Sequence, residues 1–303
     1  MKFCRSLLAT FATFAILLLS NCAVLNAPLA DAANTLADVG KLGPQLNVPI
    51  LMYHHVGNPN TFPTYSVDLK MFQWQMDYLA EQGFTTVSLD QLIDALHGKA
   101  PLPPKPIAIT FDDGWAQQLA DTLPALQKHG FKATYYIIVN VLDRNPSYMT
   151  WAQVKQLRDA GMWIGSHTLT HRNLKRLHGA ALQAELVQSK KILEQQLGLP
   201  VTTFAYPGGA FNAQVEQATQ AAGYTSAVTV RRGYRQNAKT PFRLRRMGVY
   251  GVDTQARFIA KIDQSFLKKQ WPHPPGQAHL PDVSPDPGFD ETETNPIATP
   301  ASP

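Results

Sequence analysis

Short apolar runs and longer amphipathic segments alternate through the middle of the chain. Each run has the length and the apolar character of a buried strand. The predicted strands cover residues 49–53, 85–89, 107–111, 133–139, 162–166, 202–206, 225–230 and 244–249. Because most of these runs are separated by helix-like segments, the pattern predicts an α/β fold.

The segments between the runs carry helical signals. Phe72 and Met76 share one face of a helix predicted over residues 69–82, and residues 180–197 give a second clear helix. Thr150 begins a capping box that opens a third. Strands and helices in alternation predict one domain with a parallel sheet, either closed into a (β/α) barrel or open and doubly wound.

Four polar clusters stand directly at the ends of predicted strands. They contain His54 and His55, Asp112 and Asp113, His167 and His171, and the turn Tyr206-Pro207-Gly208-Gly209. Any one of them alone also fits an ordinary surface turn. The carboxyl ends of parallel strands meet on one face, where such folds keep their sites, so we expect the four clusters to form one site.

The residue types in these clusters could supply a metal site, a base and an oxyanion-binding turn. Of the adjacent acids Asp112 and Asp113, one can hold a metal while the other acts as a base. His167 and His171 can face one ion, and Asp113 could add the carboxylate of the set common for catalytic zinc and iron. The turn after Tyr206 can offer backbone N–H groups to an oxyanion.

The motifs resemble those of the polysaccharide deacetylases with a NodB-type homology domain, also called carbohydrate esterase family 4. They are Thr110-Phe111-Asp112-Asp113-Gly114, Ser166-His167-Thr168-Leu169-Thr170-His171 and Phe204-Ala205-Tyr206-Pro207-Gly208-Gly209, in the order of the family. The resemblance covers about residues 49–265. It implies a distorted (β/α) barrel of about seven strands and a divalent metal, most often Zn²⁺, with Co²⁺, Ni²⁺ or Fe²⁺ as alternatives.

The resemblance also implies residue roles. Asp112 corresponds to the catalytic base of the family, and the metal ligands correspond to Asp113, His167 and His171. In the third motif Tyr206, Pro207 and Gly208 are the candidates for binding the substrate, with the backbone N–H of Tyr206 directed at the oxyanion. Trp115 is a candidate for stacking on a sugar ring.

One position departs from the usual family pattern. Many members have an arginine that orients the base where this chain has Ala205. The Phe-Ala-Tyr-Pro form resembles the branch that includes the poly-N-acetylglucosamine deacetylases, in which a histidine of the first strand is the general acid. His54 matches that position better than His55. Arg246 is the candidate to replace the arginine, since Arg245 should point the other way along the strand.

The implied reaction is removal of N-acetyl groups from an N-acetylglucosamine-containing polysaccharide of the cell envelope or extracellular matrix, of the poly-N-acetylglucosamine type. Peptidoglycan and chitin oligomers are the alternative substrates. An acetyl-xylan esterase and an inactive carbohydrate-binding module on the same fold are further alternatives. A positioned acid such as His54 favours amides over esters, because a departing amine needs a proton more than an alkoxide does.

The N-terminus predicts export. Lys2 and Arg5 precede an apolar run that is too short for a comfortable membrane span, so residues 1–33 resemble a signal peptide. Residues 30–32 offer a signal-peptidase site, whereas the residues around Cys22 resemble a lipoprotein box, and a lipidated Cys22 would tether the protein to a membrane. We expect the protein in the periplasm, in the cell envelope or outside the cell.

Composition adds few restrictions. The two cysteines, Cys4 and Cys22, both lie in the targeting segment, so the domain is expected to have no intrachain disulfide. The net charge of +5 is a mild excess, and the chain has no recognisable nucleic-acid reader motif, so no nucleic-acid partner is expected. We predict a linker over 34–48, a deacetylase domain over 49–268 and a Pro-rich disordered tail over 269–303. No oligomeric state is indicated.

Overall fold

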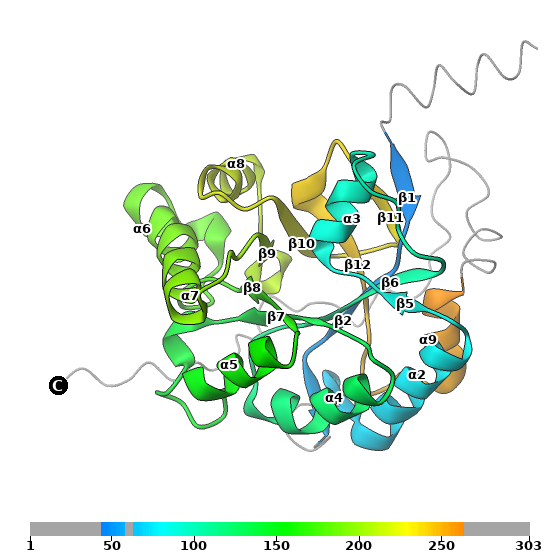
Figure 1. Ribbon diagram of the computed structural model, residues 1–303. Helices are drawn as coiled ribbons and strands as arrows, with labels where there is room; N and C mark the ends of the chain where they lie inside the picture. The colour runs from blue at the N-terminus through cyan, green and yellow to red at the C-terminus, as the bar shows by residue number, and fades with distance from the viewer. Residues whose placement is uncertain (1–43, 58–62, 264–303) are drawn as a thin grey trace, which may run out of the picture. The chain divides into compact units, whose positions relative to one another are not determined.

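A computed structural model describes residues 44–57 and 63–263 of the chain. Seven parallel strands close into a barrel in the order β2-β12-β10-β9-β8-β7-β6, and β2 pairs with β6 to complete the ring (Figure 1). These strands are β2 (Ile50–Tyr53), β6 (Pro106–Phe111), β7 (Thr134–Ile137), β8 (Trp163–Ser166), β9 (Thr203–Ala205), β10 (Ser226–Arg232) and β12 (Leu244–Gly248). The predicted seven-stranded (β/α) barrel is confirmed, and the open sheet is excluded.

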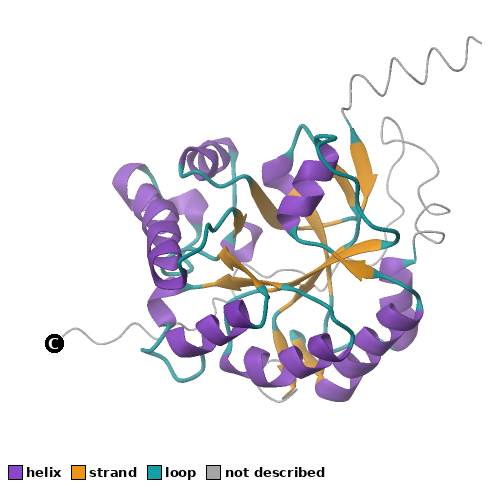
Figure 2. Cartoon of the chain, viewed as in Figure 1, coloured by secondary structure: helices purple, strands orange, loops and turns teal. Residues whose placement is uncertain are grey.

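Helices surround the barrel, as the purple and orange elements of Figure 2 show. They are α2 (Leu69–Glu81), α3 (Leu89–Leu96), α4 (Ala116–Lys128), α5 (Trp151–Asp159), α6 (Gly179–Gln183), α7 (Ser189–Leu197), α8 (Ala213–Ala221) and α9 (Gln255–Ile262). The helices expected at residues 69–82 and after Thr150 are confirmed, the second with its capping box. The helix expected over residues 180–197 is present as α6 and α7, joined by the π-helical stretch η3 (Ala184–Gln188).

The prediction of a strand over residues 85–89 is wrong in its second half. Only β5 (Thr85–Thr86) is extended, and it pairs with β6 outside the ring. Ser88 then caps α3, because its Oγ accepts the Gln91 N–H at 3.0 Å while the Gln91 side chain accepts the Ser88 N–H at 2.8 Å. This reciprocal capping box begins a helix immediately after the apolar run.

The folded domain begins earlier than residue 49. β1 (Gln45–Asn47) pairs antiparallel with β11 (Arg235–Asn237), so the end of the predicted linker belongs to the domain. Backbone pairing with a strand distant in sequence leaves no signal in the local pattern. The signal peptide, Cys22, the rest of the linker and the tail lie outside the described residues. None of the described helices is long and apolar enough to span a membrane.

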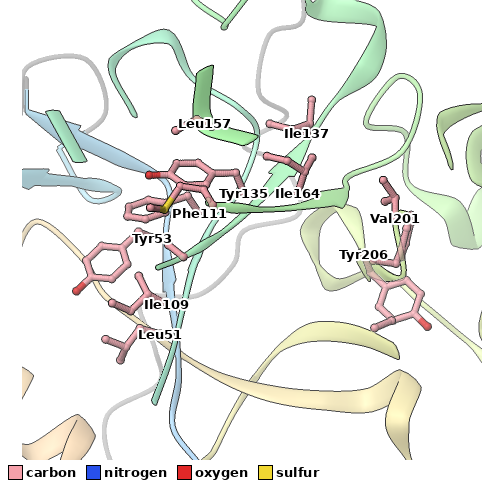
Figure 3. Packing of buried hydrophobic residues seen from close by; sticks show 14 of the residues in the cluster. Leu51, Tyr53, Ile109, Phe111, Tyr135, Ile137, Leu157, Ile164, Val201 and Tyr206 are labelled. Atoms are coloured by element: carbon pink, nitrogen blue, oxygen red, sulfur yellow. The ribbon is translucent and has the colours of Figure 1, made fainter. Parts of the chain in front are cut away.

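The core has two layers, one inside the barrel and one between the barrel and the helices. In the outer layer Phe111 stacks on Tyr53 at 5.3 Å and on Tyr135 at 4.8 Å between ring centroids (Figure 3). The Tyr53 hydroxyl donates to Gln75 of α2, and the Tyr135 hydroxyl bonds to Thr122 of α4. The rings therefore hold β2, β6 and β7 against the helices, and the hydroxyls of both tyrosines are satisfied.

Inside the barrel, β8 approaches β7 so closely that one position has room only for glycine. A Cβ atom on Gly165 would lie 2.5 Å from the ring of Tyr136, which is fully buried. The φ angle of Gly165 is not in the left-handed region, so the restriction at this position comes from packing and not from the backbone.

We expect Gly165→Ala to destabilise the domain by about 1–3 kcal/mol, the usual cost of overpacking a core. The measurement is the midpoint of urea unfolding for variants with the same m-value. Gln217→Ala, on the exposed side of α8, is the control and should stay within about 0.5 kcal/mol of the wild type. An unchanged midpoint for Gly165→Ala would show that the barrel can open at this point.

Candidate active site

A buried ion pair lies at the centre of the candidate site. Asp112 follows β6, is 2% exposed and accepts two hydrogen bonds from Arg246 of β12, which is 1% exposed. Both bonds, from Nη1 to Oδ1 and from Nη2 to Oδ2, are 2.7 Å long. The arrangement is the bidentate pairing that a planar guanidinium makes with a carboxylate. The other basic residues nearby point elsewhere, since Arg243 binds Glu216 and Arg245 is exposed.

The rest of the Arg246 guanidinium is also fixed. Its Nε donates to the carbonyl oxygen of Thr229 at 3.0 Å, and Nη1 also donates to the Thr110 hydroxyl at 3.2 Å. Burial alone would raise the pKa of Asp112, but the charge and hydrogen bonds of Arg246 outweigh it and lower the pKa. Asp112 is therefore an ionised carboxylate in a dry setting, which suits a base.

The neighbouring carboxylate faces two histidines. Asp113 Oδ1 lies 3.4 Å from His167 Nε2 and 3.5 Å from His171 Nε2. Candidate ligand atoms of the three residues all lie within 4.8 Å of one another. Burial alone would raise the pKa of Asp113, but the contact with His167 and the charge of His171 lower it. Two imidazole nitrogens and one carboxylate oxygen around a common point fit a divalent metal that retains open positions.

The orientation of His167 is set by the residue that departs from the family pattern. His167 Nδ1 lies 2.8 Å from the carbonyl oxygen of Ala205, which can only accept, so Nδ1 carries the proton and Nε2 faces the carboxylate. Burial alone would lower the pKa of His167, but the hydrogen bond to Asp113 raises it. A metal at Nε2 would need the form of His167 that carries its proton on Nδ1 alone, which is the form that the Ala205 carbonyl favours.

His171 is placed by a loop with an unusual backbone. Its φ is +61°, that of Thr168 is +71° and that of Asp113 is +77°, all in the left-handed region. The His171 N–H donates to the Thr168 hydroxyl at 2.8 Å. Burial, followed by the charge of His167, lowers the pKa of His171 to about 4, so its imidazole is neutral at pH 7 and has a lone pair for a metal.

His54 and His55 have different surroundings. His54 Nε2 is 4.0 Å from Asp112 Oδ2, and its side chain is 14% exposed. Burial lowers the pKa of His54. The His55 ring instead packs on Trp115 at 4.1 Å between centroids. Gln118 holds the two strand ends together, because its Nε2 donates at 2.7 Å to the carbonyl oxygens of both His54 and Asp112.

The third turn lies against the barrel, with Pro207 buried and Gly208 exposed at φ +56°. The Tyr206 ring is buried and stacks on Phe211 at 4.8 Å, so it offers no surface to a sugar. The Tyr206 N–H donates to the carbonyl oxygen of Val228 at 3.4 Å, a long hydrogen bond. The backbone amide of Tyr206, which is the candidate donor to the oxyanion, is thus only weakly hydrogen-bonded to β10.

Sugar stacking by Trp115 does not agree with the structure. The residue is 6% exposed, and its ring packs on both His55 and Tyr148. Its Nε1 donates to Asp113 Oδ2 at 2.9 Å, on the oxygen that does not face the histidines. Trp115 therefore orients a metal-ligand candidate, a role that its position two residues after Asp113 could have suggested.

Comparisons with known proteins identify the family. The family model described as "Polysaccharide deacetylase" matches residues 99–227. The Bacillus subtilis protein "Putative polysaccharide deacetylase YxkH" is 30% identical over 216 residues, which cover 71% of this chain and 76% of that protein. The chain therefore belongs to the polysaccharide deacetylase family and is a hydrolase that acts on N-acetyl amides.

Two further similarities are more limited. The Listeria monocytogenes enzyme "Peptidoglycan-N-acetylglucosamine deacetylase PgdA" is 31% identical over 114 residues, which cover 37% of this chain but only 23% of that protein. The structure of Streptococcus pyogenes deacetylase PplD in complex with acetate has a TM-score of 0.68 at 24% identity, covering 73% of this chain and 99% of that one. The second similarity supports the fold alone.

The site geometry predicts that substituting a metal-ligand candidate and substituting the candidate base have different effects. We expect His167→Ala to lose stoichiometric metal, because a ligand is missing, whereas Asp112→Asn should keep the metal and lose at least about 100-fold in turnover. Metal analysis after dialysis and acetate release measure the two effects. His178→Ala, at an exposed position, is the control and should keep both. Full metal binding by purified His167→Ala would contradict the assignment.

Proposed function

We propose that this protein removes N-acetyl groups from a polymer of N-acetylglucosamine of the poly-N-acetylglucosamine type. The observation that carries the proposal is the bidentate Arg246–Asp112 pair in a chain that has Ala205 in the third motif. The alternative arginine and the Phe-Ala-Tyr-Pro motif together favour the branch to which such deacetylases belong. Asp112, Asp113, His167, His171 and His54 are all present at the site, which favours an enzyme over an inactive binding module.

In the proposed mechanism each residue has a separate task. Asp113, His167 and His171 would hold a divalent metal, for which we propose Zn²⁺. When bound, the metal supplies Lewis-acid chemistry that activates water and polarises the acetyl carbonyl. Asp112 accepts the proton of the attacking water, and Arg246 keeps that carboxylate ionised and in one orientation.

The remaining steps concern the oxyanion and the leaving group. The Tyr206 N–H makes only a long hydrogen bond of 3.4 Å to the Val228 carbonyl. A developing oxyanion carries more negative charge than that carbonyl and is therefore the stronger acceptor for this N–H. His54 Nε2 lies 4.0 Å from Asp112 Oδ2, so His54 can take over the proton that Asp112 removes from the water and donate it to the departing amine. Because an amine needs this proton more than an alkoxide, the site favours an amide over the ester of acetyl-xylan.

Peptidoglycan is the second candidate substrate, and the similarity to the Listeria enzyme over 114 residues favours it. We also propose that the protein is exported, either released after signal-peptidase cleavage or tethered through a lipidated Cys22. The apolar run behind Lys2 and Arg5 and the small residues that follow support this location. Both candidate substrates are reached outside the cytoplasm.

A substrate panel tests the function. The zinc-loaded protein is incubated with oligomers of poly-N-acetylglucosamine, chitin oligomers, peptidoglycan and acetylated xylan, and both acetate and free amine are measured. We expect equal amounts of acetate and amine, with the poly-N-acetylglucosamine oligomers at least about tenfold better in kcat/KM, a discrimination of about 1.4 kcal/mol. A chelator should stop the reaction. Binding of sugar by the fully metal-loaded protein without acetate release would contradict the proposal.

Arg246 gives a second test. Lysine cannot make the bidentate contact, so we expect Arg246→Lys to lower kcat about 10- to 100-fold at a nearly unchanged KM. Arg245→Lys is the matched control, because Arg245 is the exposed neighbour on the same strand, and it should stay within about twofold of the wild type. Equal losses in the two variants would exclude a specific role for Arg246.

A further inference from the structure

The loop that carries His171 is bound by a buried carboxylate from a distant helix. Glu185 lies in η3 and is 4% exposed. One carboxylate oxygen, Oε2, accepts the backbone N–H groups of Leu169 at 3.0 Å and Thr170 at 2.9 Å. The other oxygen, Oε1, accepts the Thr170 hydroxyl. All three donors belong to the two residues immediately before His171.

This contact supports a strained segment. Thr168 and His171, on either side of the contacted residues, both have positive φ. For residues other than glycine, such conformations persist only where the surroundings enforce them, at a cost of about 1–3 kcal/mol each. The bond from the His171 N–H to the Thr168 hydroxyl lies within the loop, whereas the Glu185 carboxylate ties the loop to another element.

The π-helical stretch brings the same helix to both ends of the loop. The Ser189 hydroxyl donates to the Glu185 carbonyl oxygen at 2.7 Å. The Ser166 hydroxyl, at the start of the loop, donates to the Ser189 hydroxyl at 3.0 Å. π-Helical turns are frequent at functional sites, where they redirect side chains.

The two histidines differ in how far they depend on the loop. His167 is held by the barrel itself, through its N–H to the Ile137 carbonyl oxygen and through Nδ1 to that of Ala205. The His171 side chain is 19% exposed, and that of His167 is 3% exposed. His171 is therefore the ligand whose position depends most on the support of the loop.

We propose that Glu185 is a positioning residue that holds His171 in its metal-binding place by accepting the amides of Leu169 and Thr170. The inference rests on the proposed metal role of His171. Without the carboxylate, two partly buried N–H groups lose their acceptor and the strained loop can relax. Mutation of a residue that orients a metal ligand typically lowers metal affinity about 10- to 100-fold.

The experiment measures Zn²⁺ affinity by competition with a chromophoric chelator for the wild type, Glu185→Ala and Glu185→Gln. We expect Glu185→Ala to lose about 10- to 100-fold in affinity. Glu185→Gln should lose less, because an amide oxygen can still accept from both backbone groups. Glu194→Gln is the matched control, since Glu194 lies on α7 and binds Lys190 and the Val201 N–H instead; it should keep the affinity of the wild type.

A second measurement uses the metal-free protein. Hydrogen exchange at the amides of Leu169 and Thr170 should be faster in Glu185→Ala than in the wild type, and the exchange of β8 should be unchanged. A lower Tm with Zn²⁺ affinity within about twofold of the wild type would overturn the proposal and leave Glu185 a structural residue.

Failure of the Glu185 proposal can be distinguished from failure of the proposed deacetylase function. A wild-type protein that binds Zn²⁺ but releases no acetate would remove the deacetylase mechanism, while the difference between Glu185→Ala and Glu194→Gln would still decide the positioning role. A wild-type protein that binds no Zn²⁺ would overturn both.

Discussion

The site depends on one buried ion pair, between Arg246 and Asp112. Two charges that are each at most 2% exposed are stable only together, and removing one partner of such a pair typically costs about 3–5 kcal/mol. The bidentate geometry keeps Asp112 ionised where burial alone would favour its protonated form. Closure of the barrel places β12 and β6 on either side of β2, so the fold brings the two residues together.

Around this pair, contacts from the strand ends hold the other groups, one from a backbone carbonyl and one from a side chain. The Ala205 carbonyl sets the tautomer of His167, and Trp115 fixes the second oxygen of Asp113. The positive φ angles at Asp113 and His171 turn the chain sharply, so that side chains from different strands face one point. The two adjacent acids therefore have different roles, because both oxygens of Asp112 face Arg246, whereas Oδ1 of Asp113 faces the two histidines.

The local pattern predicted a parallel α/β fold, closed or open, and the positions of the main polar clusters, and the resemblance of the motifs to the family implied the barrel. Apolar runs mark the strands, and polar residues at the strand ends must gather on one face of a parallel barrel. The contacts of Glu185 and β1 were missed because they join residues distant in sequence, and such tertiary contacts have no local signature. The contact of Trp115 with Asp113 is local, and it was missed because the ring was assigned to a sugar. The helix at Leu89 was missed for another reason, since its capping box follows directly on an apolar run.

The central claim is that one acid holds the metal while the other, held by arginine, stays outside the coordination sphere. A crystal structure of the zinc-loaded protein, with the ion located by anomalous scattering, tests this most directly. The account predicts Zn²⁺ bound by Asp113 and by Nε2 of His167 and His171, with both Arg246–Asp112 hydrogen bonds intact. Zn²⁺ bound by Asp112, or Arg246 turned away from Asp112, would contradict it.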